Sequence, residues 1–119
     1  MNLVLIGRFK HARDAEQVED LIGKLTEQAI KDETYSVSHA DPDEQRFSDD
    51  MRKMLWDLKV YTLGPVEIEQ FAFDHNLERK EATITVRTDE ADVSAFIKLF
   101  VEAGARVEVF SAHHQSPEE

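Results

Sequence analysis

Histidine and carboxylate residues, which can act as acids, bases or metal ligands, gather in one polar stretch of the sequence. His39, Asp41, Asp43 and Glu44 stand close together there, and such groups bind divalent cations when their geometry converges. The stretch lacks the central glycine and the distal glutamate of an EF-hand loop. We therefore expect a solvated acidic loop, and we predict no metal site and no cofactor.

The remaining histidines offer no catalytic arrangement. Asp74 and His75 are neighbours on an expected strand, so their side chains point to opposite faces, while His113 and His114 lie in the expected tail. The sequence contains no cysteine, which removes thiol nucleophiles, thiolate zinc sites and iron–sulfur clusters together. No catalytic residue is predicted, and nothing in the sequence supports an enzyme.

Composition and charge restrict the class of partner. The chain has 119 residues, of which 41% are hydrophobic, and a formal net charge of −11. This fits one domain over residues 1–112 followed by a disordered acidic tail at 113–119. A strongly acidic chain repels phosphate backbones, so nucleic acid is disfavoured as a ligand. The lack of cysteine and of any long apolar span predicts a cytoplasmic protein that does not enter a membrane.

The elements that must position these residues follow from the hydrophobic pattern. Residues 2–9 are apolar on both faces, as in a central strand. Asp14 opens a helix. The apolar stripe of this helix is formed by Ala15, Val18, Leu21, Ile22, Leu25, Ala29 and Ile30. Its other face is acidic and is either solvated or a docking surface. A polar connection is expected over 32–46, with at most a short edge strand at Tyr35 and Val37.

An additional helix is predicted after that connection. Ser48 caps it, and Gly64–Pro65 ends it. Its apolar stripe is formed by Met51, Met54, Leu55 and Leu58. Residues 66–77 fit either a helix that starts at Pro65 or a strand. We favour a strand over the second half of this stretch, because apolar and aromatic residues alternate there.

A hairpin and a last helix complete the pattern. A turn at 79–81 leads into a strand over 82–87 that has one buried face. Asp89 caps the last helix and Gly104 stops it. Residues 106–111 form the final strand.

The order of these elements predicts an α+β fold. Without the additional helix it is βαββαβ, the ferredoxin-like arrangement of a four-stranded antiparallel sheet with two helices on one face. The additional helix is inserted between the first helix and the second strand. We expect Leu21, Ile84 and Phe96 to be fully buried in the core.

Several segments carry a family resemblance. They are Asn2-Leu-Val-Leu-Ile-Gly-Arg-Phe-Lys10 with Leu25-Thr-Glu-Gln28, Gln45-Arg-Phe-Ser48, Gly64-Pro65 with Glu69-Gln-Phe-Ala72, Asp92-Val-Ser-Ala-Phe96 and Gly104-Ala-Arg-Val-Glu-Val109. Together they resemble a small family of functionally uncharacterised bacterial proteins with a ferredoxin-like pattern. The resemblance covers most of the chain and implies no activity and no ligand set.

The expected topology gathers basic residues at one end of the sheet, where the loop after the first strand, the hairpin and the start of the last strand meet. This basic pole comprises Arg8, Lys10, His11, Arg13, Arg79, Lys80 and Arg106. It could bind a carboxylate-rich segment, a phosphate or a nucleotide. Alternatively, its charge serves only solubility.

The sheet face that the two main helices leave open is expected to be partly apolar. It should carry Val4, Ile6, Thr83, Thr85 and Phe110, and such a face is too apolar to stay bare. Either the additional helix covers it, or two chains pair through it as a homodimer.

These features predict a non-catalytic protein-interaction or regulatory module that binds another protein. Its candidate surfaces are Trp56, the acidic helix face and the basic pole, and Trp56 is the best single anchor. Two alternatives stay open. One is an acidic inhibitor or defence-related protein that mimics nucleic acid, which needs carboxylates spaced like phosphates on one face. The other is a small ligand-binding protein or enzyme of the dimeric α+β barrel type, which needs a pocket between the sheet and the additional helix.

Overall fold

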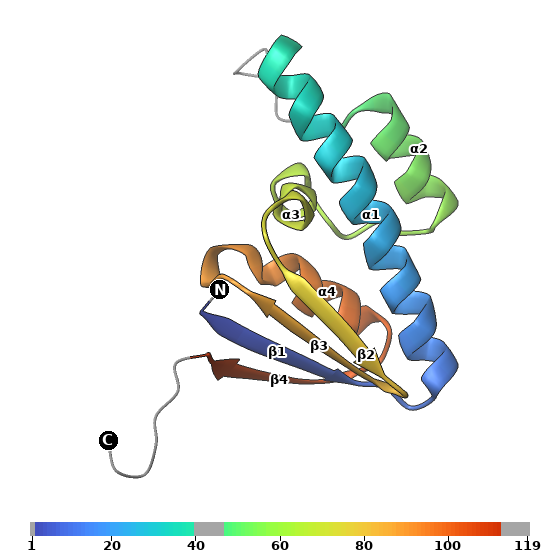
Figure 1. Cartoon of the computed structure of the whole chain (residues 1–119). Coiled ribbons are helices and arrows are strands. Elements are labelled where there is room, and N and C mark those ends of the chain that lie inside the picture. The colour runs from blue at the N-terminus through green and yellow to red at the C-terminus, as the bar shows by residue number, and fades with distance from the viewer. Residues whose placement is uncertain (1, 40–46, 113–119) are drawn as a thin grey trace.

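The chain folds into the predicted mixture of helices and antiparallel strands (Figure 1). The computed structural model describes residues 2–39 and 47–112, with side chains described for 2–32 and 47–112. Its elements are β1 (Leu3–Arg8), α1 (Ala12–His39), α2 (Asp49–Asp57), α3 (Pro65–Glu69), the 3-10 turn η1 (Gln70–Ala72), β2 (Asn76–Lys80), β3 (Thr83–Thr88), the 3-10 turn η2 (Glu90–Asp92), α4 (Ser94–Glu102) and β4 (Arg106–Ser111). The α+β class is therefore confirmed.

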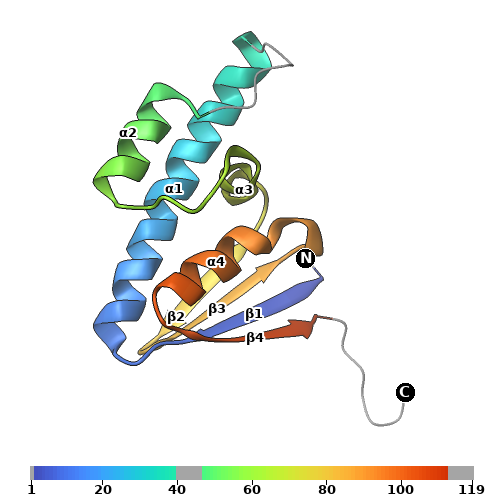
Figure 2. The same ribbon diagram turned by 180° about the vertical axis from the view of Figure 1, so that it is seen from behind.

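The sheet has four strands in the order β2-β3-β1-β4, and each strand is antiparallel to its neighbours. The face that carries Leu5, Ile84 and Val86 is buried against α1 and α4. In Figure 1 the opposite face is turned towards the viewer with α4 behind it, and Figure 2 shows α4 in front of the sheet. One face of the sheet is thus covered by helices and the other is left open.

Helix α1 is longer than predicted. It begins at Ala12, two residues before Asp14, and continues to His39. The polar connection predicted over 32–46 is therefore wrong for residues 32–39, as is the edge strand predicted at Tyr35 and Val37, while residues 40–46 lie outside the described part of the chain. The physical reason is that residues 32–39 contain neither glycine nor proline. A polar composition alone does not end a helix, because most polar residues cost little in a helix interior.

Helix α2 begins as predicted and ends earlier. The Met51 N–H donates to the Ser48 side-chain oxygen at 3.0 Å, which confirms the cap. The helix ends at Asp57 because Lys59 adopts a positive φ of 59°, well before Gly64–Pro65. It packs against the outer side of α1, away from the sheet (Figures 1 and 2). The alternative in which this helix covers the open sheet face is therefore not realised.

The ambiguous stretch over 66–77 is mostly helical. Pro65 starts α3, Phe71 lies in η1, and β2 begins only at Asn76, so the preference for a strand was wrong for most of the second half. Ile68 and Phe71 are both buried, and their spacing of three residues is that of one helix face. The alternation of aromatic residues further along resembled a strand but did not outweigh this helical spacing.

The end of the chain follows the predicted pattern closely. Gly104 has a φ of 78° and stops α4 as expected, and β4 covers the predicted residues. Two boundaries differ. The hairpin turn is made by Glu81 and Ala82, with φ of 54° at Glu81. Asp89 precedes η2 rather than capping α4.

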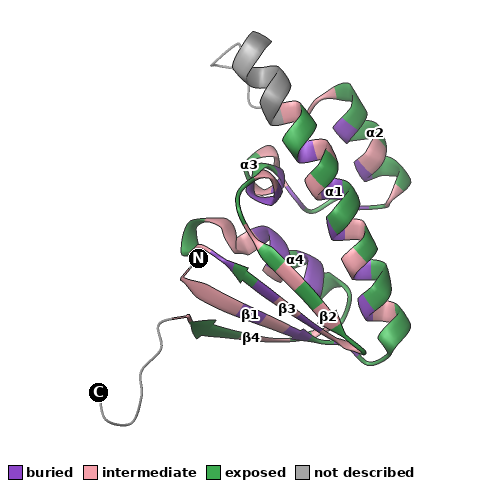
Figure 3. Cartoon of the chain, in the orientation of Figure 1, coloured by how far each residue is buried: buried purple, intermediate pink, exposed green. Residues whose placement is uncertain are grey.

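The core lies between the sheet, α1, α3, η1 and α4, with a second part between α1 and α2 (Figure 3). Ile84 and Phe96 are fully buried, as predicted, whereas Leu21 is only partly buried. Ile22 takes the buried position instead, because successive helix residues point about 100° apart. Among the helices in the described ranges, none has a long enough apolar stretch to cross a membrane.

Candidate functional site

The sheet face opposite α1 and α4, called the open face below, is an ordered grid of side chains, because directly paired residues of antiparallel strands point to the same side. Read from β2 through β3 and β1 to β4, the far row is Asn76, Arg87, Val4 and Phe110, the middle row is Glu78, Thr85, Ile6 and Glu108, and the end row is Lys80, Thr83, Arg8 and Arg106. The register therefore confirms the residues expected on this face. It also adds charged residues that the sequence did not single out.

The end row collects cations. Arg8 and Arg106 are direct partners across β1 and β4, and like charges in such positions destabilise a sheet. The Arg8 Nε donates to Glu108 Oε1 at 3.0 Å, which neutralises one of them. Within the described part of the chain, Lys80 and Arg106 form no ion pair. The open face thus carries a net positive charge on a chain whose formal net charge is −11.

The predicted basic pole lies at one end of the sheet, but the sheet divides it. The Phe9 N–H donates to the Ala82 carbonyl at 2.8 Å, so the hairpin turn and the end of β1 are adjacent. Arg79 is the direct partner of buried Ile84, which places it on the helix side of the sheet. Arg8, Lys80 and Arg106 lie on the open face instead. At the hairpin, however, Arg8, Arg79 and Lys80 line one depression, so the sheet divides the pole only in part.

The remaining pole residues lie near the start of α1. Lys10 and His11 are exposed in the loop before this helix, and Arg13 is in its first turn. Arg79 Nε donates to Glu19 at 2.9 Å, and its Nη2 lies 3.8 Å from Glu16. These carboxylates neutralise Arg79, so it contributes little positive potential to a ligand.

A second exposed surface is an aromatic pair at the end of α2. Trp56 is 73% exposed and Tyr61 is 65% exposed. Their ring centroids are 5.9 Å apart with a tilt of 59°. Trp56 was predicted as an interaction anchor, whereas Tyr61 was missed. No local signal singled out Tyr61, because it stands between the apolar residues Val60 and Leu63, where an aromatic residue is expected to serve the core.

Backbone contacts hold this aromatic pair in place. The Lys59 N–H donates to the Trp56 carbonyl at 3.2 Å, and the Val60 N–H donates to the Leu55 carbonyl at 2.9 Å. Val60 and Leu63, on either side of Tyr61, are buried. Tyr61 is therefore an exposed ring on a segment that is anchored at both ends.

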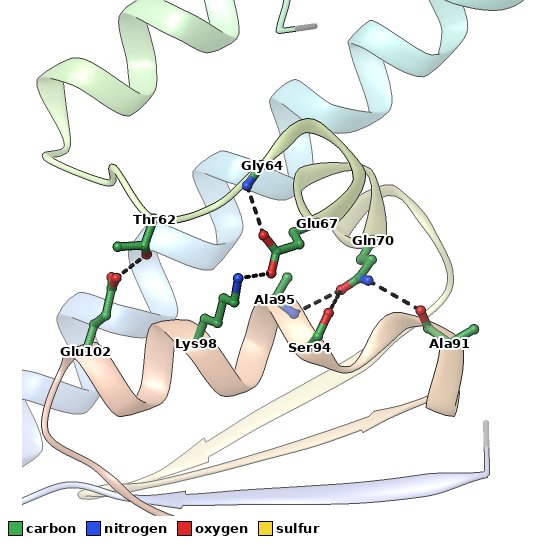
Figure 4. A network of polar contacts seen from close by, with 9 residues as sticks. All are labelled: Thr62, Gly64, Glu67, Gln70, Ala91, Ser94, Ala95, Lys98 and Glu102. Carbon is green, nitrogen blue, oxygen red and sulfur yellow. Dashed lines mark hydrogen bonds and ion pairs between the residues drawn. The ribbon is translucent and has the colours of Figure 1, made fainter. Parts of the chain in front are cut away.

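A polar network fixes the next segment to α4 (Figure 4). Glu67 accepts from the Gly64 N–H at 2.9 Å and lies 2.5 Å from Lys98 Nζ, while the Thr62 hydroxyl contacts Glu102. The hydrogen bond from Gly64, followed by that from Lys98, lowers the pKa of Glu67 from its ordinary value. Each oxygen of the Glu67 carboxylate thus has a partner, Gly64 for Oε1 and Lys98 for Oε2, so this side chain has a structural role.

Gln70 extends this network to the start of α4 (Figure 4). Its Oε1 accepts from the Ala95 N–H at 2.9 Å and from the Ser94 hydroxyl at 3.0 Å, and its Nε2 donates to the Ala91 carbonyl at 3.3 Å. Val93, at the helix start, provides no side-chain cap. A glutamine from η1 therefore supplies the cap that the local sequence of α4 lacks.

Metal-ligating side chains do not converge in the part of the chain that the structure describes. Over residues 2–32 and 47–112, no group of three or more His, Asp or Glu residues could hold a metal ion. His75 donates from Nδ1 to the Phe73 carbonyl at 3.0 Å and packs against Phe96. The predicted acidic loop at His39, Asp41, Asp43 and Glu44, and the tail histidines His113 and His114, fall outside the described side chains.

Comparison with known proteins adds a family and no function. No curated protein and no solved structure matches the chain. The sequence matches a family of unknown function, DUF6375, over residues 1–119. This agrees with the resemblance to an uncharacterised family that the sequence segments carry, and the chain therefore belongs to the family of unknown function DUF6375.

Proposed function

We propose that this chain is a non-catalytic protein-interaction module that binds another protein through the Trp56–Tyr61 pair. The observation that carries the proposal is the exposure of two adjacent aromatic rings, 73% and 65%, at a fixed place on the surface. Tryptophan and tyrosine are the residue types most enriched among side chains that dominate binding energy. Leaving both in water is unfavourable unless a partner covers them.

The rigidity of the pair supports the proposal further. Association costs free energy for every side chain or loop that must be ordered on binding. Tyr61 lies between buried Val60 and Leu63, and α2 is closed by the turn at Lys59. Much of the ordering is thus already present in the free protein, as it is in binding surfaces that are preorganised.

Neighbouring charges suggest the chemistry of the partner surface. Lys53 precedes Trp56 by three residues, so the two lie side by side on α2, and Lys59 follows in the turn. Both lysines are exposed. A partner with an apolar pocket for the two rings and carboxylates at the rim of that pocket complements this surface.

The two alternatives have less support. The exposed carboxylates of α1 alternate with cations, since Lys24 lies 3.1 Å from Asp20 and Lys31 lies 3.8 Å from Glu27. Such pairs do not imitate an unbroken row of phosphates. The ligand-binding alternative needs a pocket between the sheet and α2, but α2 packs on α1. We retain the nucleic-acid mimic only as an outcome of the test below.

We also infer that the fold is ferredoxin-like. The support is the strand order β2-β3-β1-β4 with antiparallel neighbours throughout. Two right-handed β-α-β crossovers, from β1 to β2 and from β3 to β4, lead to this order. In this interpretation α2 and α3 are insertions in the first crossover, and they carry the proposed binding surface outside the common framework.

Site-specific photocrosslinking in cells of the native host tests the proposed function. A benzophenone amino acid replaces Tyr61 in one variant and Phe73 in the control. Phe73 is also an exposed aromatic residue but lies beyond η1. The proposal expects a defined protein adduct from position 61, its loss when Trp56→Ala is added, and no such adduct from position 73.

Other outcomes are informative. Equal adducts from positions 61 and 73 contradict the proposal, because they indicate that proteins contact the chain without preferring the Trp56–Tyr61 pair. A crosslinked nucleic-acid-binding enzyme that nucleic acid displaces favours the mimic instead. Absence of any protein adduct at position 61 across growth conditions contradicts the assignment of the pair as the binding surface.

A further inference from the structure

The open face has a shape that allows one unusual kind of pairing. Strands in a sheet are about 4.8 Å apart, and residues on the same side of a strand are about 6.8 Å apart. Four strands with three rows therefore give a grid of roughly 14 Å by 14 Å. Because the grid is nearly square, it can be laid on a second copy either with parallel strands or with strands crossed at about 90°.

Aligned pairing of two copies brings like charges together. A two-fold axis parallel to the strands lays β2 of one copy on β4 of the other, so Lys80 faces Arg106 and Glu78 faces Glu108. A two-fold axis across the strands lays the middle row on itself. Glu78 then faces Glu78 and Glu108 faces Glu108. Like-charge juxtaposition of this kind disfavours an interface.

Crossed pairing brings opposite charges together. When the strands cross at about 90°, the edge strands β2 and β4 of one copy lie over the end row and the far row of the other. Glu78 and Glu108, at the middle of those edge strands, then face the central part of these rows, where Arg8 and Arg87 stand. This holds for both diagonals of the square, although each diagonal pairs the residues differently. Each diagonal also lays one corner cation on its own copy, either Lys80 or Arg106, so four opposite-charge contacts stand against one like-charge contact.

The centre of the face supplies the apolar contact. Ile6 and Thr85 are paired at the middle of the grid, so the same two residues of the other copy lie over them in the crossed arrangement. Val4 and Ile6 are half-buried, and Phe110 is 48% exposed. Covering these side chains removes apolar surface from water, which favours association.

We propose that two copies of this chain pair through their open faces with crossed strands, so that Glu78 and Glu108 of each copy contact Arg8 and Arg87 of the other. The face measures roughly 20 Å by 20 Å including its margins, so the dimer buries about 800 Å² in total, below the range of stable complexes. The dimer is therefore weak, with a dissociation constant on the order of 10 to 100 μM. This surface is separate from Trp56, since α2 lies beyond α1 (Figure 1).

Sedimentation velocity between about 5 and about 500 μM protein brackets this range and tests the proposal. The wild type is expected to shift from monomer to dimer. Glu78→Arg removes two symmetry-related contacts and is expected to weaken the dimer by about tenfold or more. Glu27→Arg, on α1 and away from the open face, is the matched control and is expected to leave dimerisation unchanged. Circular dichroism verifies that both variants fold.

Charge swaps then test the crossed geometry. Glu78→Arg is combined with Arg8→Glu in one double variant and with Arg87→Glu in another. We expect only one of these two double variants to dimerise more tightly than both of its single variants. In that double variant the two exchanged charges again face each other across the interface. The pair that recovers identifies the diagonal.

The overturning results are equally specific. A wild type that stays monomeric throughout the range excludes the dimer. A dimer that Glu78→Arg leaves unchanged, or two double variants that both show simple additivity, excludes the crossed arrangement. A short bismaleimide crosslinker adds a direct readout, since Thr85→Cys introduces a single cysteine into a chain that has none. Covalent dimers are expected from Thr85→Cys and not from Gly23→Cys on α1.

Discussion

Replacing Gly7 by alanine tests how β1 packs against α4. A Cβ atom at Gly7 would lie 2.6 Å from Cδ2 and 2.9 Å from Cε2 of Phe100. Ordinary contacts between carbon atoms are about 3.5 to 4.0 Å. Phe100 is fully buried and lies edge-on against Phe9, with ring centroids 5.6 Å apart. The ring has no free space into which it could retreat.

The magnitude follows from this overlap of about 1 Å. Either α4 moves away from β1 or the Phe100 ring leaves its preferred rotamer, and overpacking of this kind costs about 1 to 3 kcal/mol. We expect Gly7→Ala to lower the free energy of unfolding by about 2 to 3 kcal/mol, and the melting temperature by roughly 10 °C for a chain of this size. Urea unfolding followed by circular dichroism measures the loss.

The same substitution at Gly23 provides a matched control. Gly23 lies in α1, and an added Cβ would have no heavy atom within 4 Å. Alanine there is expected to raise stability by about 0.5 to 1 kcal/mol through helix propensity. Combining Gly7→Ala with Phe100→Leu should cost less than the sum of the two single changes. A Gly7→Ala variant within about 0.5 kcal/mol of the wild type would refute the close packing of β1 and α4.

The other predictions concern the polar contacts that hold the helices. Gln70→Ala leaves the start of α4 uncapped and is expected to cost about 2 kcal/mol in urea unfolding, whereas Glu69→Ala beside it is exposed and should cost less than about 0.5 kcal/mol. The folded-state pKa of Glu67 is lowered, so its stabilisation is present above the unfolded-state pKa and is lost as the pH falls through the folded-state value. Glu67→Gln should therefore destabilise the chain at pH about 7 and converge with the wild type in strong acid. Ser48→Ala removes the cap of α2 and is expected to cost about 1 kcal/mol, measured by melting temperature.

Local signals in the sequence located several elements correctly. Ser48 caps α2 because its side-chain oxygen reaches an amide within the same turn. Gly104 ends α4 because only glycine adopts a positive φ without strain. The alternation of buried Ile84 and Val86 identified β3. In each case the cause lies within a few residues, which is why the sequence alone was sufficient.

The errors arose where the cause is distant in sequence. The cap of α4 comes from Gln70, 25 residues before Ala95, so Asp89 was the wrong choice. Leu21 and Ile22 are adjacent and equally apolar, and only the packing of α1 decides which is buried. The strand register decides which residues share the open face, and it was needed to place Glu78 among them.

In the candidate surfaces, too, features with a local cause were predicted and features that depend on distant contacts were missed. Trp56 was predicted because a tryptophan off the apolar stripe of a helix is conspicuous in sequence. Tyr61 was missed because its approach to Trp56 depends on the turn at Lys59. The basic pole was predicted from topology, but the side of the sheet on which Arg79 lies depends on its pairing with Ile84. The sequence therefore showed which residue types were present, but it did not show on which face of the helix or sheet each of them lies.

The most direct test of the proposed function is the affinity of the partner crosslinked through position 61, measured by isothermal titration calorimetry against three forms of the chain. The forms are the wild type, Trp56→Ala and Phe73→Ala, which removes an exposed aromatic ring elsewhere. The proposal predicts that Trp56→Ala weakens binding by at least about 2 kcal/mol, or roughly 30-fold, while Phe73→Ala binds like the wild type. Equal affinities for the wild type and Trp56→Ala would contradict the assignment of the Trp56–Tyr61 pair as the anchor of a protein-interaction module.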